Sequence, residues 1–146
     1  MAVEVLTDKE VADLLPQVDV MKTLESMFGA LGRGEALQPV QVQTIFPAGH
    51  GDFINYSGVW MSAGVYGIKT SPYIVKENGH VVTAWTLLMS TETGEPVLLA
   101  DSARLTLERT AATTALAVRY LAKDSAKRLA IIGTGAQALA HLRYVA

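Results

Sequence analysis

The feature that most constrains this chain is a glycine-rich turn near its C-terminal end. Residues 131–138 read Ile-Ile-Gly-Thr-Gly-Ala-Gln-Ala, which has the form G-x-G-x-x-A. The predicted strand Arg128–Ile132, apolar after its arginine, precedes the glycines, and a helical pattern continues to Ala146. A buried strand, a tight glycine turn and a helix in this order are typical of the first unit of a Rossmann dinucleotide-binding domain. The alternative is a strand–helix turn that binds nothing, because the glycine pattern alone is weakly specific.

Each small residue of the turn has a physical role in the first interpretation. Gly133 allows the tight turn, Gly135 lets the backbone approach a pyrophosphate, and Ala138 allows the helix to pack closely on the strand. The N-terminus of the helix, at Ala136 and Gln137, attracts the anion. We therefore predict that the cofactor contacts Gly133, Gly135, Ala136 and Gln137.

The nucleotide-binding unit is incomplete in this sequence. A βαβ unit takes about 30 residues or more, and only 20 residues run from Lys127 to Ala146. The acidic residue that reads the ribose is expected about 20 positions after the glycines, which lies past Ala146. The predicted cofactor is therefore NAD or NADP, without distinction between them. We expect one domain over residues 1–125 and the first βα unit of a truncated Rossmann domain over residues 126–146.

The part of the chain before the turn predicts a mixture of helices and strands. Thr7–Glu10 fits a capping box that opens one helix, and Asp19 is suited to cap a second one. Residues 40–100 are rich in alternating and β-branched runs, and Asn78-Gly79 between two such runs is a strong hairpin signal. Residues 105–122 are alanine-rich and helical. The predicted fold class is α/β, with a mainly antiparallel sheet in an N-terminal α+β domain followed by the start of a Rossmann domain.

Composition narrows the classes of function. Of the 146 residues, 50% are hydrophobic, which suits a packed core, and the net charge of −2 provides no basic field for nucleic acid or an anionic membrane. The absence of cysteine excludes disulfides, thiolate metal sites and a cysteine nucleophile.

The three histidines have no ligand-like spacing, so we expect no metal site. Met1–Lys9 has no signal-peptide pattern and no apolar run is long enough for a membrane span, which predicts a cytoplasmic protein.

Five segments occur in an order that resembles a known family. They are Lys69 in a Gly-Ile-Lys context, Val82–Trp85, Thr93–Leu99, Leu105–Ala112 with its Arg-Thr-Ala-Ala, and Ile131–Gln137. Together they resemble the ornithine cyclodeaminase/mu-crystallin family over nearly the whole chain. The resemblance implies a longer homodimeric protein, in which an N-terminal domain carries the dimer interface and the substrate pocket and a Rossmann domain binds a nicotinamide cofactor.

The resemblance also assigns roles to two basic residues. It implies that Lys69 contacts the substrate near the reacting carbon, where it binds a carboxylate or donates a proton. It implies that Arg109 lies near both the cofactor and the substrate carboxylate, which a guanidinium holds with two parallel hydrogen bonds. The alternatives are a lysine lying along a sheet edge and an exposed helix arginine paired with Glu108 or Asp101.

Gln41 departs from the family pattern. An arginine commonly follows Pro39-Val40 in the family and helps to hold the substrate carboxylate, whereas glutamine keeps hydrogen bonding but loses the charge. We keep Gln41 as a predicted substrate-binding residue, and its identity puts ornithine in doubt as the substrate. Thr110, next to Arg109, is predicted to support the cofactor, with simple packing as the alternative.

The expected activity is hydride transfer at the α-carbon of a small amino acid or its imine, as an NAD(P)-dependent cyclodeaminase or as an imine reductase of the pyrroline-2-carboxylate type. The alternatives are a mu-crystallin-like protein that binds cofactor and ligand with little turnover, and a truncated dimerisation domain. We expect a homodimer whose only other partner is the substrate. The isolated 146-residue chain is expected to be a catalytically inactive oligomer, because the cofactor-binding half is missing. In it, Leu129–Ile132 would lack the neighbours that a parallel strand normally has.

Overall fold

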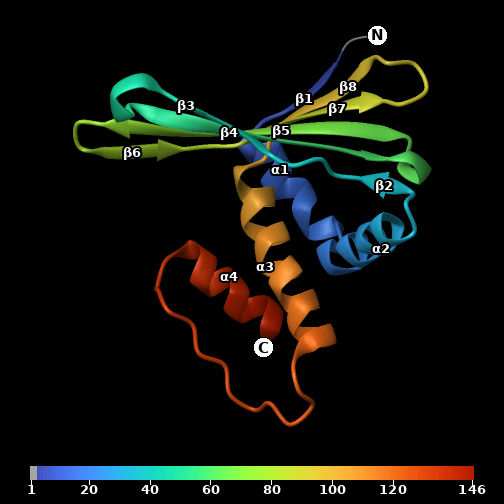
Figure 1. Cartoon of the computed structure of the whole chain (residues 1–146), viewed down its shortest axis with the longest axis vertical. Coiled ribbons are helices and arrows are strands. Elements are labelled where there is room, and N and C mark those ends of the chain that lie inside the picture. Colours follow the sequence, from blue (N-terminus) through green and yellow to red (C-terminus); the bar gives the residue numbers. More distant parts are fainter. Residues whose placement is uncertain (1–2) are drawn as a thin grey trace.

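The computed structural model describes residues 3–146, in which helices cover one face of a curved sheet (Figure 1). The first two residues, part of the segment in which we expect no signal peptide, lie outside the described residues. The strands are β1 (Glu4–Leu6), β2 (Ala36–Leu37), β3 (Val42–Ile45), β4 (Gly51–Trp60), β5 (Val65–Lys76), β6 (Gly79–Val82), β7 (Trp85–Ser90) and β8 (Pro96–Asp101). The helices are α1 (Asp8–Leu14), α2 (Val20–Gly32), α3 (Ala103–Leu121) and α4 (Ala136–Val145), and short 3-10 turns are η1 (Leu15–Gln17), η2 (Pro47–Gly49) and η3 (Met61–Ala63).

The sheet has the order β1-β8-β7-β5-β4-β2, with β3 also paired to β4 and β6 also paired to β5. The pairs are antiparallel apart from β1 with β8, which run parallel. The antiparallel sheet predicted for residues 40–100 is therefore confirmed, and so is the hairpin, since Lys76 pairs with Gly79 across Glu77-Asn78. Strand β1 was not predicted, because three residues are too few to display an alternating pattern.

Local side-chain signals explain where the first helices begin. The Glu10 carboxylate accepts a hydrogen bond from the backbone N–H of Thr7 at 2.9 Å, and the Glu10 N–H donates to the Thr7 hydroxyl at 3.5 Å. This is the predicted capping box, and it opens α1. Asp19 accepts from the backbone N–H of Lys22 at 2.9 Å and caps α2, also as predicted.

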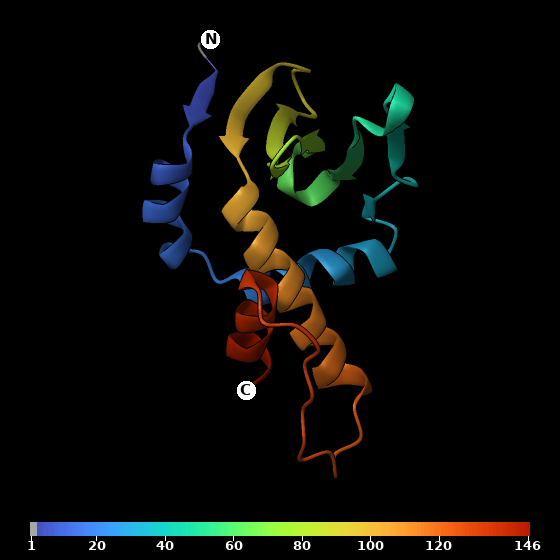
Figure 2. The same ribbon diagram turned by 90° about the vertical axis from the view of Figure 1, so that its left-hand side faces the viewer.

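Small side chains hold α3 and α4 against each other. Figures 1 and 2 show α4 lying alongside α3, and Ala112 of α3 and Ala140 of α4 are both completely buried. The Thr114 hydroxyl and the His141 Nε2 atom lie 3.0 Å apart at this contact. Alanine faces let two helix backbones approach closely. Helix α4 therefore packs against α3, although a long segment, residues 122–135, separates the two helices in the sequence.

The predicted strand Arg128–Ile132 is wrong for this chain. Residues 127–134 have no regular structure, and Ile132 is fully exposed to solvent. A strand requires a neighbour that pairs with its backbone N–H and C=O groups, and within residues 3–146 no strand lies beside this segment. The helix after the glycine turn forms as predicted and begins at Ala136.

No helix between residues 3 and 146 combines the length and the apolar character that crossing a membrane requires. The same residues contain no group of three or more His, Asp or Glu side chains that could hold a metal ion.

Candidate functional site

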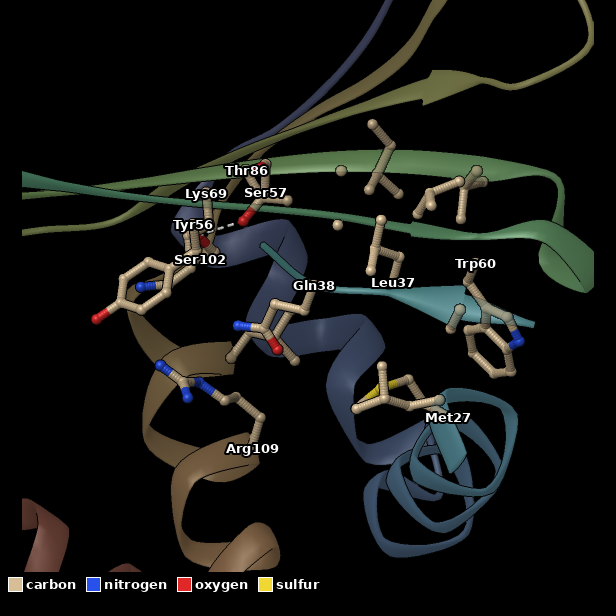
Figure 3. Close-up of a pocket in the computed structure, with 18 of the residues that line it drawn as sticks. Met27, Leu37, Gln38, Tyr56, Ser57, Trp60, Lys69, Thr86, Ser102 and Arg109 are labelled. Atoms are coloured by element: carbon tan, nitrogen blue, oxygen red, sulfur yellow. Dashed lines mark hydrogen bonds between the residues drawn. The ribbon is translucent and has the colours of Figure 1, made fainter. Parts of the chain in front are cut away.

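A cavity of about 340 Å³ lies between the sheet and helices α2 and α3 (Figure 3). This volume is at the lower end of the range for small-molecule pockets. Strands β2, β4, β5 and β7 contribute its floor and side, and α3 contributes the wall opposite the floor. The lining is mostly apolar and contains no Asp or Glu.

The register of three antiparallel strands orders the floor of the cavity. Side chains alternate between the two faces of a sheet, so residues two positions apart along a strand share one face. Cross-strand pairing then places the floor residues in three successive rows, which are Tyr56–Lys69–Thr86, Gly58–Gly67–Leu88 and Trp60–Val65. The floor therefore changes from polar to open to apolar along its length.

Lys69 lies in the polar row, on an interior strand of the sheet. Its ammonium lies 4.6 Å from the centroid of the Tyr56 ring and donates a hydrogen bond to the Ser71 hydroxyl. The alternative of a lysine at a sheet edge is wrong, because β4 and β7 flank β5 on both sides at this position. Burial, followed by the nearby positive charge of Arg109, lowers the pKa of Lys69 to about 8. Lys69 is therefore a cation at neutral pH that can give up a proton close to neutrality.

Arg109 reaches the same cavity from α3. Figure 3 shows its guanidinium below Tyr56 and Lys69, at the end of the cavity opposite Trp60. The expected alternative partner Glu108 instead accepts a hydrogen bond from Arg143 at 2.8 Å. The other alternative, Asp101, accepts one from the backbone N–H at position 103, and no ion pair among residues 3–146 includes Arg109. Two cations that share a cavity without an acidic residue form a site for an anion such as a carboxylate.

Several hydroxyl groups of the site were not predicted from the sequence. Ser102 is buried, and its Oγ accepts a hydrogen bond from the Thr86 hydroxyl at 2.8 Å. The Thr106 hydroxyl is buried and has no hydrogen-bond partner within residues 3–146. Positions 102, 105, 106 and 109 follow helical spacing and line the cavity together. This spacing, counted back from Arg109, is a signal that could have identified Ser102 and Thr106.

Other predicted residues lie elsewhere. Gln41 is exposed and is not among the residues that line the cavity, whereas Gln38 lines it. The Thr110 hydroxyl donates to the backbone carbonyl of Thr106 at 2.6 Å and does not line the cavity. Trp60, expected in the core or an interface, lines the cavity. The structure thus brings Lys69 and Arg109 together but does not bring Gln41 to them.

The glycine turn is a separate feature at the start of α4. Gly133 has φ +116°, a backbone conformation that favours glycine. Gly135 is the N-cap of α4 and provides no side-chain cap, and the next two residues, Ala136 and Gln137, are exposed. Uncapped amides at a helix N-terminus beside residues without bulky side chains fit a pyrophosphate group. The turn residues therefore fit a dinucleotide.

Comparisons with known proteins agree with these features. A family model described as "Ornithine cyclodeaminase/mu-crystallin family" matches residues 1–146. An NAD(P)H-dependent anabolic L-arginine dehydrogenase of Pseudomonas aeruginosa is 57% identical over 141 residues, which are 97% of this chain and 45% of the relative.

Solved structures share the fold. An archaeal alanine dehydrogenase dimer with bound NAD matches with a TM-score of 0.88 and 29% identity, over 99% of this chain and 45% of the other. The Δ1-pyrroline-2-carboxylate reductase of Thermococcus litoralis, in complex with NADH and L-proline, matches with a TM-score of 0.84 and 26% identity, over 98% of this chain and 45% of the other. The chain therefore spans less than half the length of these proteins, and the predicted α/β class is confirmed.

Proposed function

The chain belongs to the ornithine cyclodeaminase/mu-crystallin family, and on this premise we propose that it forms the carboxylate-binding part of an NAD(P)-dependent enzyme that acts at the α-carbon of an amino acid or its imine. The observation that carries the proposal is the convergence of Lys69 and Arg109 on one cavity whose lining contains no acidic residue. The relatives support the proposal, because the names of these proteins and structures refer to amino acids, namely L-arginine, alanine and L-proline.

The two cations have different roles in this proposal. Arg109 presents a planar, positively charged fork that matches a carboxylate. Lys69, with a pKa of about 8, binds the carboxylate as a cation. It is also able to donate its proton to the nitrogen of an imine as that nitrogen becomes an amine. In the oxidative direction the neutral lysine accepts that proton, so cyclodeamination and imine reduction use the same residues.

The cofactor belongs to the proposal as well. The pyrophosphate of the cofactor would be held by Gly133, Gly135, Ala136 and Gln137. Arg109 and Thr110 would lie toward the cofactor. A bound nicotinamide supplies or accepts the hydride at the α-carbon. We also propose that the protein acts as a homodimer, and the related archaeal alanine dehydrogenase, which is a dimer, supports this assignment.

The test uses the protein expressed at its natural length. Oxidation of NADH and NADPH is followed with Δ1-pyrroline-2-carboxylate and with 2-oxo acids plus ammonia, and L-ornithine and L-arginine are tried in the oxidative direction. Arg109→Gln is compared with Arg104→Gln, a matched control on the same helix whose guanidinium pairs with Asp8 at 2.6 Å.

We expect Arg109→Gln to lower kcat/KM by about a hundredfold, as the loss of a charge-assisted pair would, and Arg104→Gln to leave it within about threefold. Equal effects of the two substitutions would contradict the carboxylate role, and the absence of turnover with every substrate would contradict the proposed enzymatic activity.

A second candidate function is ligand binding with little turnover, as in mu-crystallin. The mostly apolar lining of the cavity favours it, because binding an apolar ligand needs no reactive group. Saturable binding of a carboxylate ligand without oxidation of either reduced cofactor and without release of ammonia from L-ornithine would select this alternative.

A further inference from the structure

We propose that Gly67 determines which substrate side chains the cavity accepts, and that the site favours unbranched side chains of three or more carbons over the methyl group of alanine. This inference rests on the proposed function, because it assumes that the substrate carboxylate is bound by Lys69 and Arg109. It deepens that function by naming the class of side chain and the residue that selects it.

The direction of the substrate side chain follows from the rows of the cavity floor. Lys69 and Arg109 lie at one end, so the cavity extends from a carboxylate bound there toward the opposite end, where Trp60 lies (Figure 3). The Gly58–Gly67 row is two residues further along the strands, or about 7 Å. A side chain of three carbons reaches this row, and longer chains continue toward Trp60 and Leu37.

Glycine at position 67 is explained by the space that it leaves open. Gly67 is an interior residue of β5, and it is not among the residues with positive φ, so its backbone conformation does not require glycine. Glycine inside a strand weakens the strand. A Cβ atom at position 67 would lie 3.2 Å from the Cδ2 atom of Leu88, on the floor of the cavity. Glycine therefore keeps the middle of the floor open.

Gly58, which pairs with Gly67 across β4 and β5, is explained differently. A Cβ atom at position 58 would lie 3.2 Å from the backbone carbonyl oxygen of Leu37. This carbonyl belongs to β2, which pairs with β4, so Gly58 allows the two strands to approach. At Gly67 the close neighbour is the tip of a flexible side chain, which makes it the position where the size of the floor can be changed with little effect on the backbone.

Length and shape, rather than charge, are what this part of the cavity can recognise. No Asp or Glu lines it, so it provides no ion-pair partner for a terminal ammonium or guanidinium group. The methylene groups of a long side chain lie against apolar residues, including Met27, Leu37 and Trp60. We therefore expect norvaline and norleucine to share one preference over alanine, whereas the unpaired guanidinium of arginine offsets part of its gain.

The experiment measures kcat/KM for this series of side chains with the protein at its natural length. The 2-oxo acids that correspond to alanine, norvaline, norleucine and arginine are each reduced in the presence of ammonia. Gly67→Val and the milder Gly67→Ala fill the floor, and Leu88→Ala is combined with Gly67→Val to reopen it. Ile68→Val is the matched control, because its side chain is on the opposite face of the same strand.

We expect the wild-type protein to prefer the norleucine precursor over the alanine precursor by at least about tenfold in kcat/KM, the effect of a few methylene groups in an apolar pocket. Gly67→Val should lower the value for long side chains by about tenfold or more and leave that for alanine within about threefold. Leu88→Ala should restore part of the loss. An unchanged ratio of long to short substrates in Gly67→Val would overturn the inference, as would a wild-type preference for alanine.

A binding series separates failure of this inference from failure of the proposed function. Pyruvate and 2-oxohexanoate are titrated calorimetrically into the wild-type, Gly67→Val and Gly67→Ala proteins. If no substrate is turned over, the proposed function fails, and the binding series alone decides the inference. Tighter wild-type binding of 2-oxohexanoate that is lost in the folded variants supports it, and equal binding of both acids overturns it.

Discussion

Tyr56 and Lys69 are directly opposite one another on β4 and β5, and the Lys69 ammonium lies 4.6 Å from the centroid of the Tyr56 ring. The aromatic face attracts the cation, while burial in the cavity disfavours it. Burial, followed by the positive charge of Arg109, lowers the pKa of Lys69 to about 8. The charge of the site therefore depends on pH in a range that can be measured without unfolding the protein.

Carboxylate binding should weaken as pH rises through the pKa of Lys69. The folded-state pKa is lowered to about 8, so the side chain is a cation below this pH and neutral above it. We expect the Kd for 2-oxohexanoate, measured by calorimetry, to rise several-fold between about pH 7 and pH 9. Lys69→Arg should remove this rise, because arginine stays charged. The same rise in Lys69→Arg would exclude Lys69 as its cause.

The ring of Tyr56 should influence the midpoint of this titration. Tyr56→Leu removes the aromatic face but keeps an apolar side chain, so the cation loses an attraction on the order of 1 kcal/mol. The midpoint of the pH dependence should therefore move to lower pH. Tyr56→Phe keeps the ring and should leave the midpoint in place. If Leu and Phe variants had the same midpoint, the contact would have no effect on the charge.

The hydrogen bond between Thr86 and Ser102 should make the stability effects of the two residues non-additive. Thr86→Val leaves the buried Ser102 hydroxyl without its donor and should lower the free energy of unfolding by about 1–2 kcal/mol. Ser102→Ala in the same protein should add little, since both polar partners are then gone. Urea unfolding of the single and double variants gives the coupling. Fully additive changes would show that the 2.8 Å contact contributes nothing to stability.

The capping box should contribute to the stability of α1. Thr7→Ala removes the hydroxyl that accepts from the Glu10 N–H and should lower the free energy of unfolding by about 1 kcal/mol. Lys9→Ala is the control, because Lys9 and Asp13 form an exposed ion pair at 3.5 Å, and such pairs contribute little. Urea denaturation measures both. A loss in Lys9→Ala as large as in Thr7→Ala would refute the capping role.

The isolated 146-residue chain should associate in solution and lack turnover. Ile132 is fully exposed and Leu129 is exposed on 51% of its surface, so the segment before the glycine turn presents apolar side chains to water. Ile132→Lys should shift the chain toward the monomer in analytical ultracentrifugation and leave its circular dichroism spectrum unchanged. NAD(P)H-dependent turnover by this chain would contradict the predicted inactivity. Unchanged association in Ile132→Lys would show that another surface is responsible.

Local sequence signals predicted much of the fold. The Thr7–Glu10 box, the Asp19 cap and the Asn78-Gly79 hairpin each depend on residues a few positions apart, so the sequence displays them directly. Lys69 and Arg109 were identified as site residues by resemblance, and the structure brings them to one cavity. The strand predicted at Arg128–Ile132 does not form. Its apolar pattern indicates that the segment can be buried, but a strand also needs a neighbouring strand to pair with, and the pattern does not show whether one is present.

By itself, the sequence determined which residue types were available and where α1, α2 and the hairpin begin, since interactions over three or four residues decide such features. Only the tertiary structure decided that Lys69 lies between Tyr56 and Thr86, that Gln38 and not Gln41 reaches the cavity, and that Gly67 opens its floor. These relationships depend on strand register, and a shift of one residue would turn every floor side chain to the other face. Register is set by contacts across the whole sheet, which no local pattern in the sequence contains.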